Sequence, residues 1–258
     1  MLDLPEPDRA TFADLGRTTI RIWEWGDPSD PPVLMVHGGW DHGRMWDGLA
    51  PRVAALGRHA VAIDVRGHGD SGRLPEAGPA WPMFLLDLAQ VVQRLGPPPE
   101  MMQVQDHAAS AARWLFDAER IAREPQREYA SVEEMAKKRK EINTRLPYEW
   151  CLHLAAHGTR PGPNGGVIWK SDPHMRLGSP GPFSDEQLIA QYATIRAPVM
   201  ALSGTEADQW SFLQPDDRAR RLAAFDSAEH HPVAGAGHYV HVEQPEETTR
   251  LLDAFINR

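Results

Sequence analysis

Four short apolar runs, each followed by a polar loop, constrain the fold of this chain most strongly. The runs Pro32–Val36 and His59–Ile63 lie early in the chain, and Pro198–Leu202 and a weaker run, His231–Ala234, lie near its end. Runs of this kind are typical of parallel strands that are buried on both faces. Helical periodicity lies between them and is clearest from Pro82 to Leu95. The pattern predicts an α/β fold with a doubly wound, mostly parallel sheet.

An antiparallel hairpin is predicted before the first of these runs. Phe12–Leu15 and Thr19–Trp25 flank a turn at Gly16, and Ile20 and Ile22 share one face of the second strand. Such a hairpin adds two strands at the edge of a mixed sheet. Two further helical patterns, weaker than the first, lie at residues 215–226 and 244–257.

The middle of the chain interrupts the alternation of strands and helices. Helical patterns occupy Trp114–Ala122 and Val132–Asn143, and an irregular stretch rich in Gly and Pro runs from His157 to Pro182. This change indicates an inserted helical cap. The predicted division is a core of residues 1–96 and 193–258, with the cap at residues 97–192.

Composition excludes several classes of protein. The 258 residues carry a formal net charge of −9, so the chain lacks the basic surface that binds phosphate backbones, and no nucleic-acid partner is expected. The single cysteine excludes an internal disulfide. Because no apolar run is long enough to span a bilayer and the N-terminal segment is acidic, we expect a cytoplasmic protein with no membrane partner.

Three glycine-containing loops follow predicted strands and carry polar side chains. They are His37-Gly38-Gly39-Trp40, then Asp64-Val65-Arg66-Gly67-His68-Gly69-Asp70-Ser71, and Gly235-Ala236-Gly237-His238. The carboxyl ends of parallel strands meet at one edge of a sheet, so these loops are expected to converge there. In the first loop, glycines let backbone N–H groups approach a ligand oxygen closely, as an oxyanion hole requires.

Together, the loops resemble those of the α/β-hydrolase fold superfamily, in the capped branch that includes esterases, lipases, epoxide hydrolases and carbon–carbon bond hydrolases. The resemblance covers residues 12–96 and 196–258, and the cap more loosely. It implies hydrolysis of a small, largely apolar substrate, most simply an ester, without a cofactor or metal. By position, His238 matches the general base and Asp208 the acid that orients it, with Glu206 as the alternative acid. Gly39, beside Gly38 and Trp40, matches an oxyanion-hole donor.

The chain departs from this family at the nucleophile, because no G-x-S-x-G elbow is present. One interpretation makes Asp106 the nucleophile, since Val104–Ala109 resembles the aspartate elbow of haloalkane dehalogenases and epoxide hydrolases. Another is that about 35 residues, a strand–helix–strand unit, have been lost after Gly96, which leaves Asp106 in a cap helix. Direct attack by water activated by His238, a non-catalytic binding protein and an inactive remnant are further alternatives.

Two other residue groups are predicted to be structural. His153 and His157 are spaced as in H-E-x-x-H, but Leu154 stands in place of the glutamate and no third ligand is evident, so a cap-helix surface is predicted. Cys151 is predicted to lie in the core of the same helix. The Gly67 to Gly69 segment lacks the third glycine of a dinucleotide-binding loop.

Overall fold

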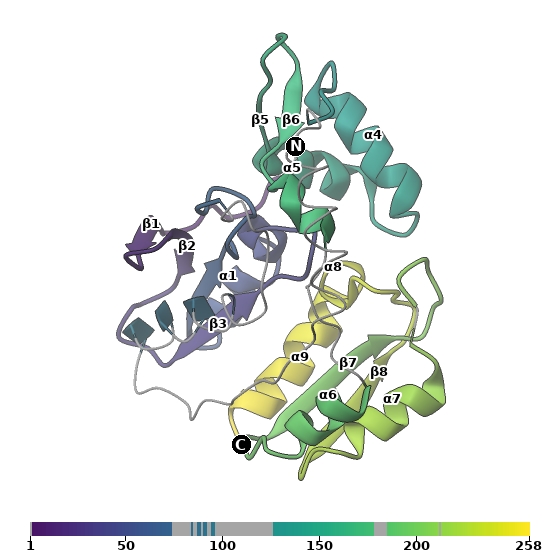
Figure 1. The fold of residues 1–258 in the computed structure, drawn as a ribbon. Helices are drawn as coiled ribbons and strands as arrows, with labels where there is room; N and C mark the ends of the chain where they lie inside the picture. The colour runs from purple at the N-terminus through teal and green to yellow at the C-terminus, as the bar shows by residue number, and fades with distance from the viewer. Residues whose placement is uncertain are drawn as a thin grey trace. The chain divides into compact units, whose positions relative to one another are not determined.

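The computed structural model describes residues 2–73, 126–177, 185–211 and 213–258, together with seven helical residues between 84 and 95. It divides into two compact units. The first consists of Met1–Lys138 and Tyr148–Pro182, and the second of Arg139–Pro147 and Phe183–Arg258. Each unit contains its own parallel strand pair (Figure 1).

The first unit is built on a four-stranded mixed sheet with the order β1-β2-β4-β3. Strands β1 and β2 pair antiparallel, β2 and β4 pair antiparallel, and β3 and β4 pair parallel. The hairpin and the two apolar strands predicted from the sequence are therefore confirmed in type. The strands are β1 Arg9–Asp14, β2 Thr19–Trp25, β3 Pro32–Val36 and β4 His59–Ile63.

Strand β2 is buried more completely than its alternation indicates. The prediction placed Ile20 and Ile22 on one buried face, but Trp23 and Trp25 on the opposite face are 9% and 2% exposed. The reason is that the segment at Gly43 packs against the Trp23 ring, so this face of β2 is covered as well. All five residues of β4 are buried, as expected for a central strand.

Helices surround this sheet within the first unit. Val91 is 1% exposed and belongs to a core cluster with Ile20 and Ile63, and Leu88 and Leu95 pack against it. Where the structure describes them, residues of the predicted Pro82–Leu95 helix are thus helical and face the sheet. The other helices of this part of the chain are η1 Gly43–Trp46, α1 Ala50–Ala54, α4 Val132–Ile142, α5 Tyr148–Gly158 and η2 Pro173–Leu177.

The stretch predicted as irregular from His157 to Pro182 contains a hairpin, so this prediction is wrong. Strands β5 Thr159–Pro161 and β6 Val167–Trp169 pair antiparallel. Gly165 has φ +90°, a conformation that glycine adopts without strain, in the turn that joins them. Three-residue strands are too short to show a period of two, which is why the pattern did not reveal them.

The second unit contains a parallel pair, β7 and β8, in which Val199 lies opposite Ala228 and Gly204 opposite Val233. The two C-terminal apolar runs are therefore confirmed as parallel strands with shifted ends. Val233 and Leu251 form the buried core with Ala236. The elements are α6 Asp185–Tyr192, β7 Val199–Gly204, α7 Pro215–Leu222, β8 Ala228–Val233, α8 Val240–Glu243 and α9 Pro245–Ile256.

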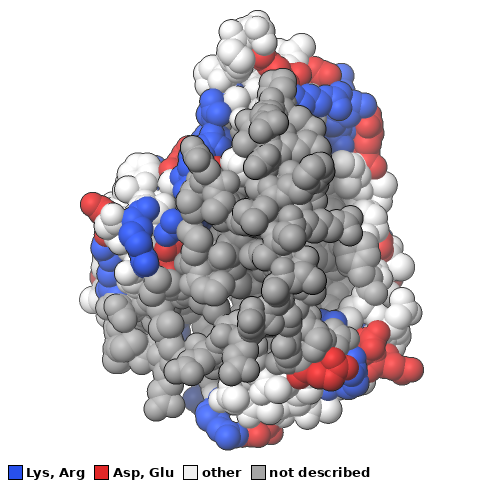
Figure 2. Space-filling view, in the orientation of Figure 1, with Lys and Arg blue, Asp and Glu red and all other residues white. Residues whose placement is uncertain are grey.

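The remaining predictions concern the cap and the surface. Val132–Asn143 is confirmed as helical by α4, whereas Trp114–Ala122 lies outside the described residues. The division into core and cap stays a prediction. Among the described helices, none has the length and apolar character needed to cross a membrane. On the face drawn in Figure 2, the described Lys and Arg side chains lie beside Asp and Glu side chains.

Candidate active site

The loop after β4 is organised by the buried carboxylate of Asp64. Its Oδ1 accepts the backbone N–H of Gly43 at 2.6 Å, and its Oδ2 accepts the N–H of Asp70 at 2.8 Å. Trp23 Nε1 donates to Oδ1 at 3.4 Å. A Cβ on Gly69, whose φ is +49°, would lie 2.1 Å from Oδ2, so glycine is required there. This carboxylate connects the loops that follow β3 and β4.

Two other side chains of the same motif also build the loop. Arg66 forms a buried bidentate ion pair with Asp87, with both N–O distances 2.7 Å. Ser71 Oγ donates to the carbonyl of Asp64 at 2.5 Å and accepts the N–H of Arg21 at 2.8 Å. Asp64, Arg66 and Ser71 of the D-x-R-G-H-G-x-S motif therefore all hold this loop in place.

Two buried histidines stand beside Asp64. Their rings, those of His37 and His68, lie edge to face with centroids 4.9 Å apart. His37 Nε2 accepts the N–H of Val65 at 3.0 Å, which fixes a neutral ring with its proton on Nδ1. Burial lowers the pKa of His37, and burial together with the nearby His37 lowers the pKa of His68 to about 4. Both rings are neutral at pH 7.

The predicted oxyanion loop after β3 is exposed. An added Cβ on Gly38 or Gly39 would meet no described atom within 4 Å, so packing against the described protein does not require glycine at either position. Trp40 is 51% exposed and has φ +71°, a strained conformation for a bulky residue. Strain of this kind clusters at functional sites. No local sequence pattern indicated this backbone conformation of Trp40.

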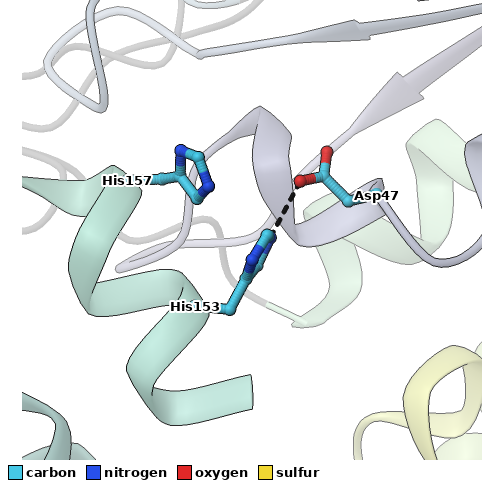
Figure 3. A group of neighbouring side chains, drawn as sticks. All are labelled: Asp47, His153 and His157. Atoms are coloured by element: carbon cyan, nitrogen blue, oxygen red, sulfur yellow. Dashed lines mark hydrogen bonds and ion pairs between the residues drawn. The ribbon is translucent and has the colours of Figure 1, made fainter. Parts of the chain in front are cut away.

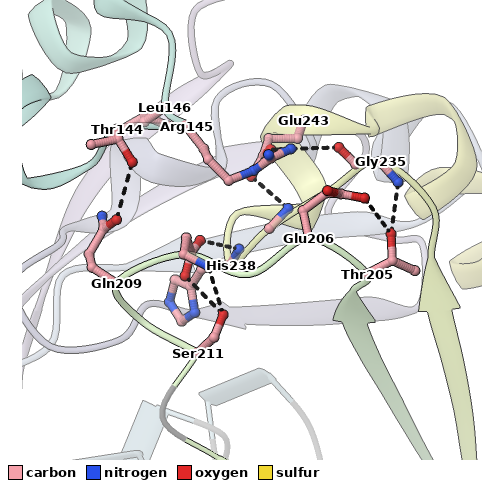
Figure 4. A network of polar contacts seen from close by, with 12 residues as sticks. Thr144, Arg145, Leu146, Thr205, Glu206, Gln209, Ser211, Gly235, His238 and Glu243 are labelled. Carbon is pink, nitrogen blue, oxygen red and sulfur yellow. Dashed lines mark hydrogen bonds and ion pairs between the residues drawn. The ribbon is translucent and has the colours of Figure 1, made fainter.

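In the second unit, the structure brings Asp208 and His238 together on the loops that follow β7 and β8. Figure 4 shows His238 within the polar network of these loops. Asp208 Oδ2 accepts the backbone N–H of His238 at 2.7 Å. Its Oδ1 accepts the N–H of Trp210 at 2.9 Å and the hydroxyl of Ser211 at 3.2 Å. A Cβ on Gly237 would lie 2.6 Å from Oδ2, so the carboxylate needs glycine there to reach the chain.

Aromatic rings flank the exposed imidazole of His238. The ring of Trp210 lies 6.1 Å from it and the ring of Tyr239 lies 5.1 Å from it, between centroids. Both aromatic residues are tied to Asn143, whose Oδ1 accepts Trp210 Nε1 at 2.9 Å and the Tyr239 hydroxyl at 3.2 Å. The histidine therefore has apolar neighbours held in place by one amide. Asn143 is far away in sequence, and nothing in its local pattern indicated this role.

The turn that carries His238 is held by a second carboxylate, which the sequence analysis missed. Glu243 Oε1 accepts the N–H of Gly237 at 3.0 Å, and its Oε2 lies 2.7 Å from the Arg145 guanidinium. Arg145 also donates to the carbonyl of Gly235 at 2.7 Å. Glu206, the alternative acid, instead accepts the hydroxyl of Thr205 at 3.2 Å.

The prediction of a surface position for His153 and His157 is wrong for His153. His153 is 3% exposed, and its Nε2 donates to Asp47 Oδ2 at 2.8 Å (Figure 3). His157, on the next turn of α5, is half-buried, and burial followed by the charge of Arg44 lowers its pKa to about 3. Asp47 is the third side chain that the spacing alone did not reveal, because it comes from a distant segment. Cys151 is 0% exposed in α5, as predicted.

The remaining candidate, Asp106, lies outside the described residues. The oxyanion loop belongs to the first unit, and the Asp208–His238 pair belongs to the second. The catalytic roles predicted for these residues stay predictions.

Part of the chain matches a known protein family and segments of two curated proteins. Residues 31–117 match the family model described as the alpha/beta hydrolase fold. An 87-residue segment, 33% of this chain, is 33% identical to epoxide hydrolase A of Mycobacterium tuberculosis and covers 27% of that protein. A 99-residue segment, 38% of this chain, is 30% identical to an esterase of the same organism and covers 30% of it. The matched segments thus span less than a third of these curated relatives.

The fold likeness extends over nearly the whole chain. A thioesterase domain from the curacin biosynthetic pathway superposes with a TM-score of 0.78 at 22% identity, covering 96% of this chain and 98% of that one. The chain therefore has the α/β-hydrolase fold, and the resemblance to that superfamily expected from the loop motifs is confirmed.

Proposed function

We propose that the protein hydrolyses a small, largely apolar, ester-like substrate, with His238 as general base and Asp208 as the acid that orients it. The observation that carries the proposal is the 2.7 Å hydrogen bond from the His238 backbone to Asp208 Oδ2, which joins two residues from separate loops. Both loops leave the carboxyl ends of parallel strands, where ligands of open α/β sheets bind.

The surroundings of His238 suit this chemistry. Its imidazole is exposed, so it is open to a substrate or a water molecule. A neutral imidazole accepts a proton from the attacking group and returns it to the leaving group. The rings of Trp210 and Tyr239 supply apolar contact for the substrate. The proposal requires the N–H of Gly39 to stabilise the oxyanion, and the cap at residues 97–192 to cover the substrate.

As a second candidate function we propose hydrolysis of an epoxide or haloalkane, with Asp106 as the nucleophile. The chain contains no G-x-S-x-G motif, and the family match at residues 31–117 extends across Asp106, which favours a core position for it over a deletion there. The likeness to a protein named an epoxide hydrolase supports the same assignment. On an epoxide, the carboxylate would attack a ring carbon and form an ester while the ring C–O bond breaks and its oxygen takes up a proton; on a haloalkane, halide would leave. Water deprotonated by His238 would then cleave that ester and release the diol or alcohol.

Purified protein assayed against aryl esters, thioesters, epoxides and haloalkanes tests this function. We expect turnover of at least one class, with kcat/KM reduced at least about 10²-fold by His238→Ala and by Asp208→Asn. His231→Ala is the matched control, because His231 lies on β8 and pairs with Glu229 at 3.3 Å. Circular dichroism confirms that every variant is folded.

The covalent intermediate separates the alternative nucleophiles. Because His238 is needed only to cleave the ester in this scheme, His238→Ala incubated with an epoxide substrate should accumulate an adduct on Asp106, detected by intact and peptide mass spectrometry. The double variant with Asp106→Asn should show none. Turnover without an adduct would support attack by water. A folded wild type that turns over no substrate faster than His238→Ala would overturn the enzymatic proposal in favour of a binding protein or an inactive remnant.

A further inference from the structure

A group of potential metal ligands lies in the first unit, between α5 and the segment that follows η1 (Figure 3). His153 and His157 are four residues apart on α5, so they project from consecutive turns on one face. Their ring centroids are 4.6 Å apart. Asp47 immediately follows η1 and reaches the same place with a side chain that is 0% exposed.

The donor atoms of this group lie close to the spacing that a small cation needs. One nitrogen of each histidine and one oxygen of Asp47 all lie within 4.8 Å of one another. Bonds of about 2.0–2.1 Å to a tetrahedral ion place its donors about 3.3 Å apart. His153 Nε2 and Asp47 Oδ2, now 2.8 Å apart, would separate by about half an ångström, and the His157 ring would turn inward.

The present contacts permit this adjustment. The Nδ1 atom of His153 has no hydrogen-bond partner within the described part of the chain, so the bond to Asp47 is the hydrogen bond that fixes its ring. The ring packs edge to face on Trp150 at 5.5 Å. His157 is half-buried, so part of its side chain is accessible to solvent.

We propose that Asp47, His153 and His157 form a binding site for one divalent transition-metal ion of the zinc class. Two imidazole nitrogens and one carboxylate oxygen are donors that Zn²⁺ and Co²⁺ accept in four-coordinate sites, and the fourth position would hold water. The ion would join α5 to the segment after η1. The proposed metal site shares no residue with the hydrolysis proposed above, because its three ligands belong to the first unit and Asp208 and His238 belong to the second.

Charged side chains near the three ligands reduce the affinity for a metal ion but leave the site able to bind one. Arg44 Nε donates to both oxygens of Asp47, at 2.8 and 2.6 Å, and so competes for the carboxylate. Its guanidinium is balanced by Glu6 at 2.8 Å, and Lys170, whose charge also acts on His157, pairs with Asp70 at 2.5 Å. The carboxylates of Asp47, Glu6 and Asp70 thus offset the charges of these two cations through ion pairs.

Titration of the untagged full chain with Co²⁺ tests the site, because visible d–d bands report tetrahedral nitrogen and oxygen ligation. We expect one Co²⁺ ion to bind per chain and to be displaced by Zn²⁺. The Co²⁺ affinity of His157→Ala should be at least about tenfold lower than that of the wild type, because even the loss of a residue that supports a ligand lowers metal affinity that much. His157 is the ligand of choice for substitution, because it is half-buried and its loss should leave the fold intact.

Control variants distinguish the loss of a ligand of this cluster from the loss of a histidine elsewhere. His231→Ala and His174→Ala remove histidines outside the cluster and should bind Co²⁺ as the wild type does, and Asp47→Asn should weaken binding as His157→Ala does. Zn²⁺ should raise the Tm of the wild type but not of His157→Ala, since an ion bound to the native state stabilises it. Absence of saturable binding, or equal affinity in the wild type and a folded His157→Ala, would overturn the site whether or not the protein hydrolyses esters.

Discussion

Asp64 and Asp208 use the same chemistry in two different regions of the molecule. Each follows a strand, and each carboxylate accepts backbone N–H groups from a loop: Gly43 and Asp70 in one case, Trp210 and His238 in the other. Asp64 is 2% exposed and its pKa is raised by burial, against the opposing effect of its N–H donors.

Asp64 and Asp208 differ in burial, and this difference gives them different roles. The oxygens of Asp64 are committed to protein donors within the core, so this residue stabilises the loops and is closed to substrate. Asp208 is half-buried and holds a loop whose histidine points to solvent. A carboxylate that holds a buried loop therefore has a structural role. A carboxylate that holds a solvent-exposed loop can form part of a candidate site.

The largest expected effect is the loss of stability in Asp64→Asn. An amide has one acceptor oxygen, so its NH₂ group would face a buried backbone N–H that Asp64 now satisfies. We expect the free energy of unfolding to fall by about 3 kcal/mol, as for other buried polar groups that lose a partner. Asp208→Asn should change it by less than about 1 kcal/mol. Urea denaturation of both variants measures the difference.

Equal losses in these two variants would contradict the comparison, because burial would then not distinguish the carboxylates. Gly69→Ala is a second test of how much the buried Asp64 contributes to stability. The new methyl group would collide with Asp64 Oδ2 at a residue with φ +49°, so this variant should reproduce the instability of Asp64→Asn without altering the carboxylate.

A loss of stability of intermediate size is expected when the pH is lowered. His68 has a pKa of about 4 in the native protein, against an ordinary value of 6.5. Between these values the unfolded chain binds the proton and the native protein does not, so stability falls as pH falls. From pH 7 to pH 5 this residue should remove about 2 kcal/mol of unfolding free energy.

Unfolding measured at several pH values in the wild type and His68→Gln tests this effect. The variant should lose the part of the pH slope due to His68, whereas His231→Ala should keep the full slope. An unchanged slope in a folded His68→Gln would show that the buried ring near Asp64 does not resist protonation.

The smallest effect is expected for Glu243→Gln. An amide oxygen can still accept the N–H of Gly237, but the charged contact with Arg145 is lost. Arg145 is partly exposed, so the cost in stability should be about 1 kcal/mol. Because Glu243 positions the turn that carries His238, we expect kcat to fall about tenfold while KM changes little. A change in KM alone would place Glu243 at substrate binding instead.

The secondary structure of the two strand pairs was predictable because it depends on local pattern. The runs before His37, Asp64 and Thr205 are continuously apolar and form parallel strands, but only the run before Asp64 is buried along its whole length, so the predicted burial is wrong for the other two. The pairing of Asp208 with His238 followed from the resemblance of the loop motifs, and the structure places the two residues in contact. Their catalytic roles stay predictions.

Other features were not predictable from local pattern. The β5–β6 hairpin has strands of only three residues, too short for periodicity. The burial of His153 depends on Asp47, which lies 106 residues away in the chain. The network of Glu243 and Arg145 spans 98 residues. A single sequence contains no signal for a contact between such distant residues.

The order of strands and helices, the glycines that loops require and the residue types available for chemistry are all properties of the local sequence. These follow from side-chain volume, polarity and backbone freedom, which act locally. The tertiary structure alone decided which carboxylate is buried, which is open and which histidines it meets. Those outcomes depend on desolvation and hydrogen bonding between distant segments, and these forces act only once the chain has packed.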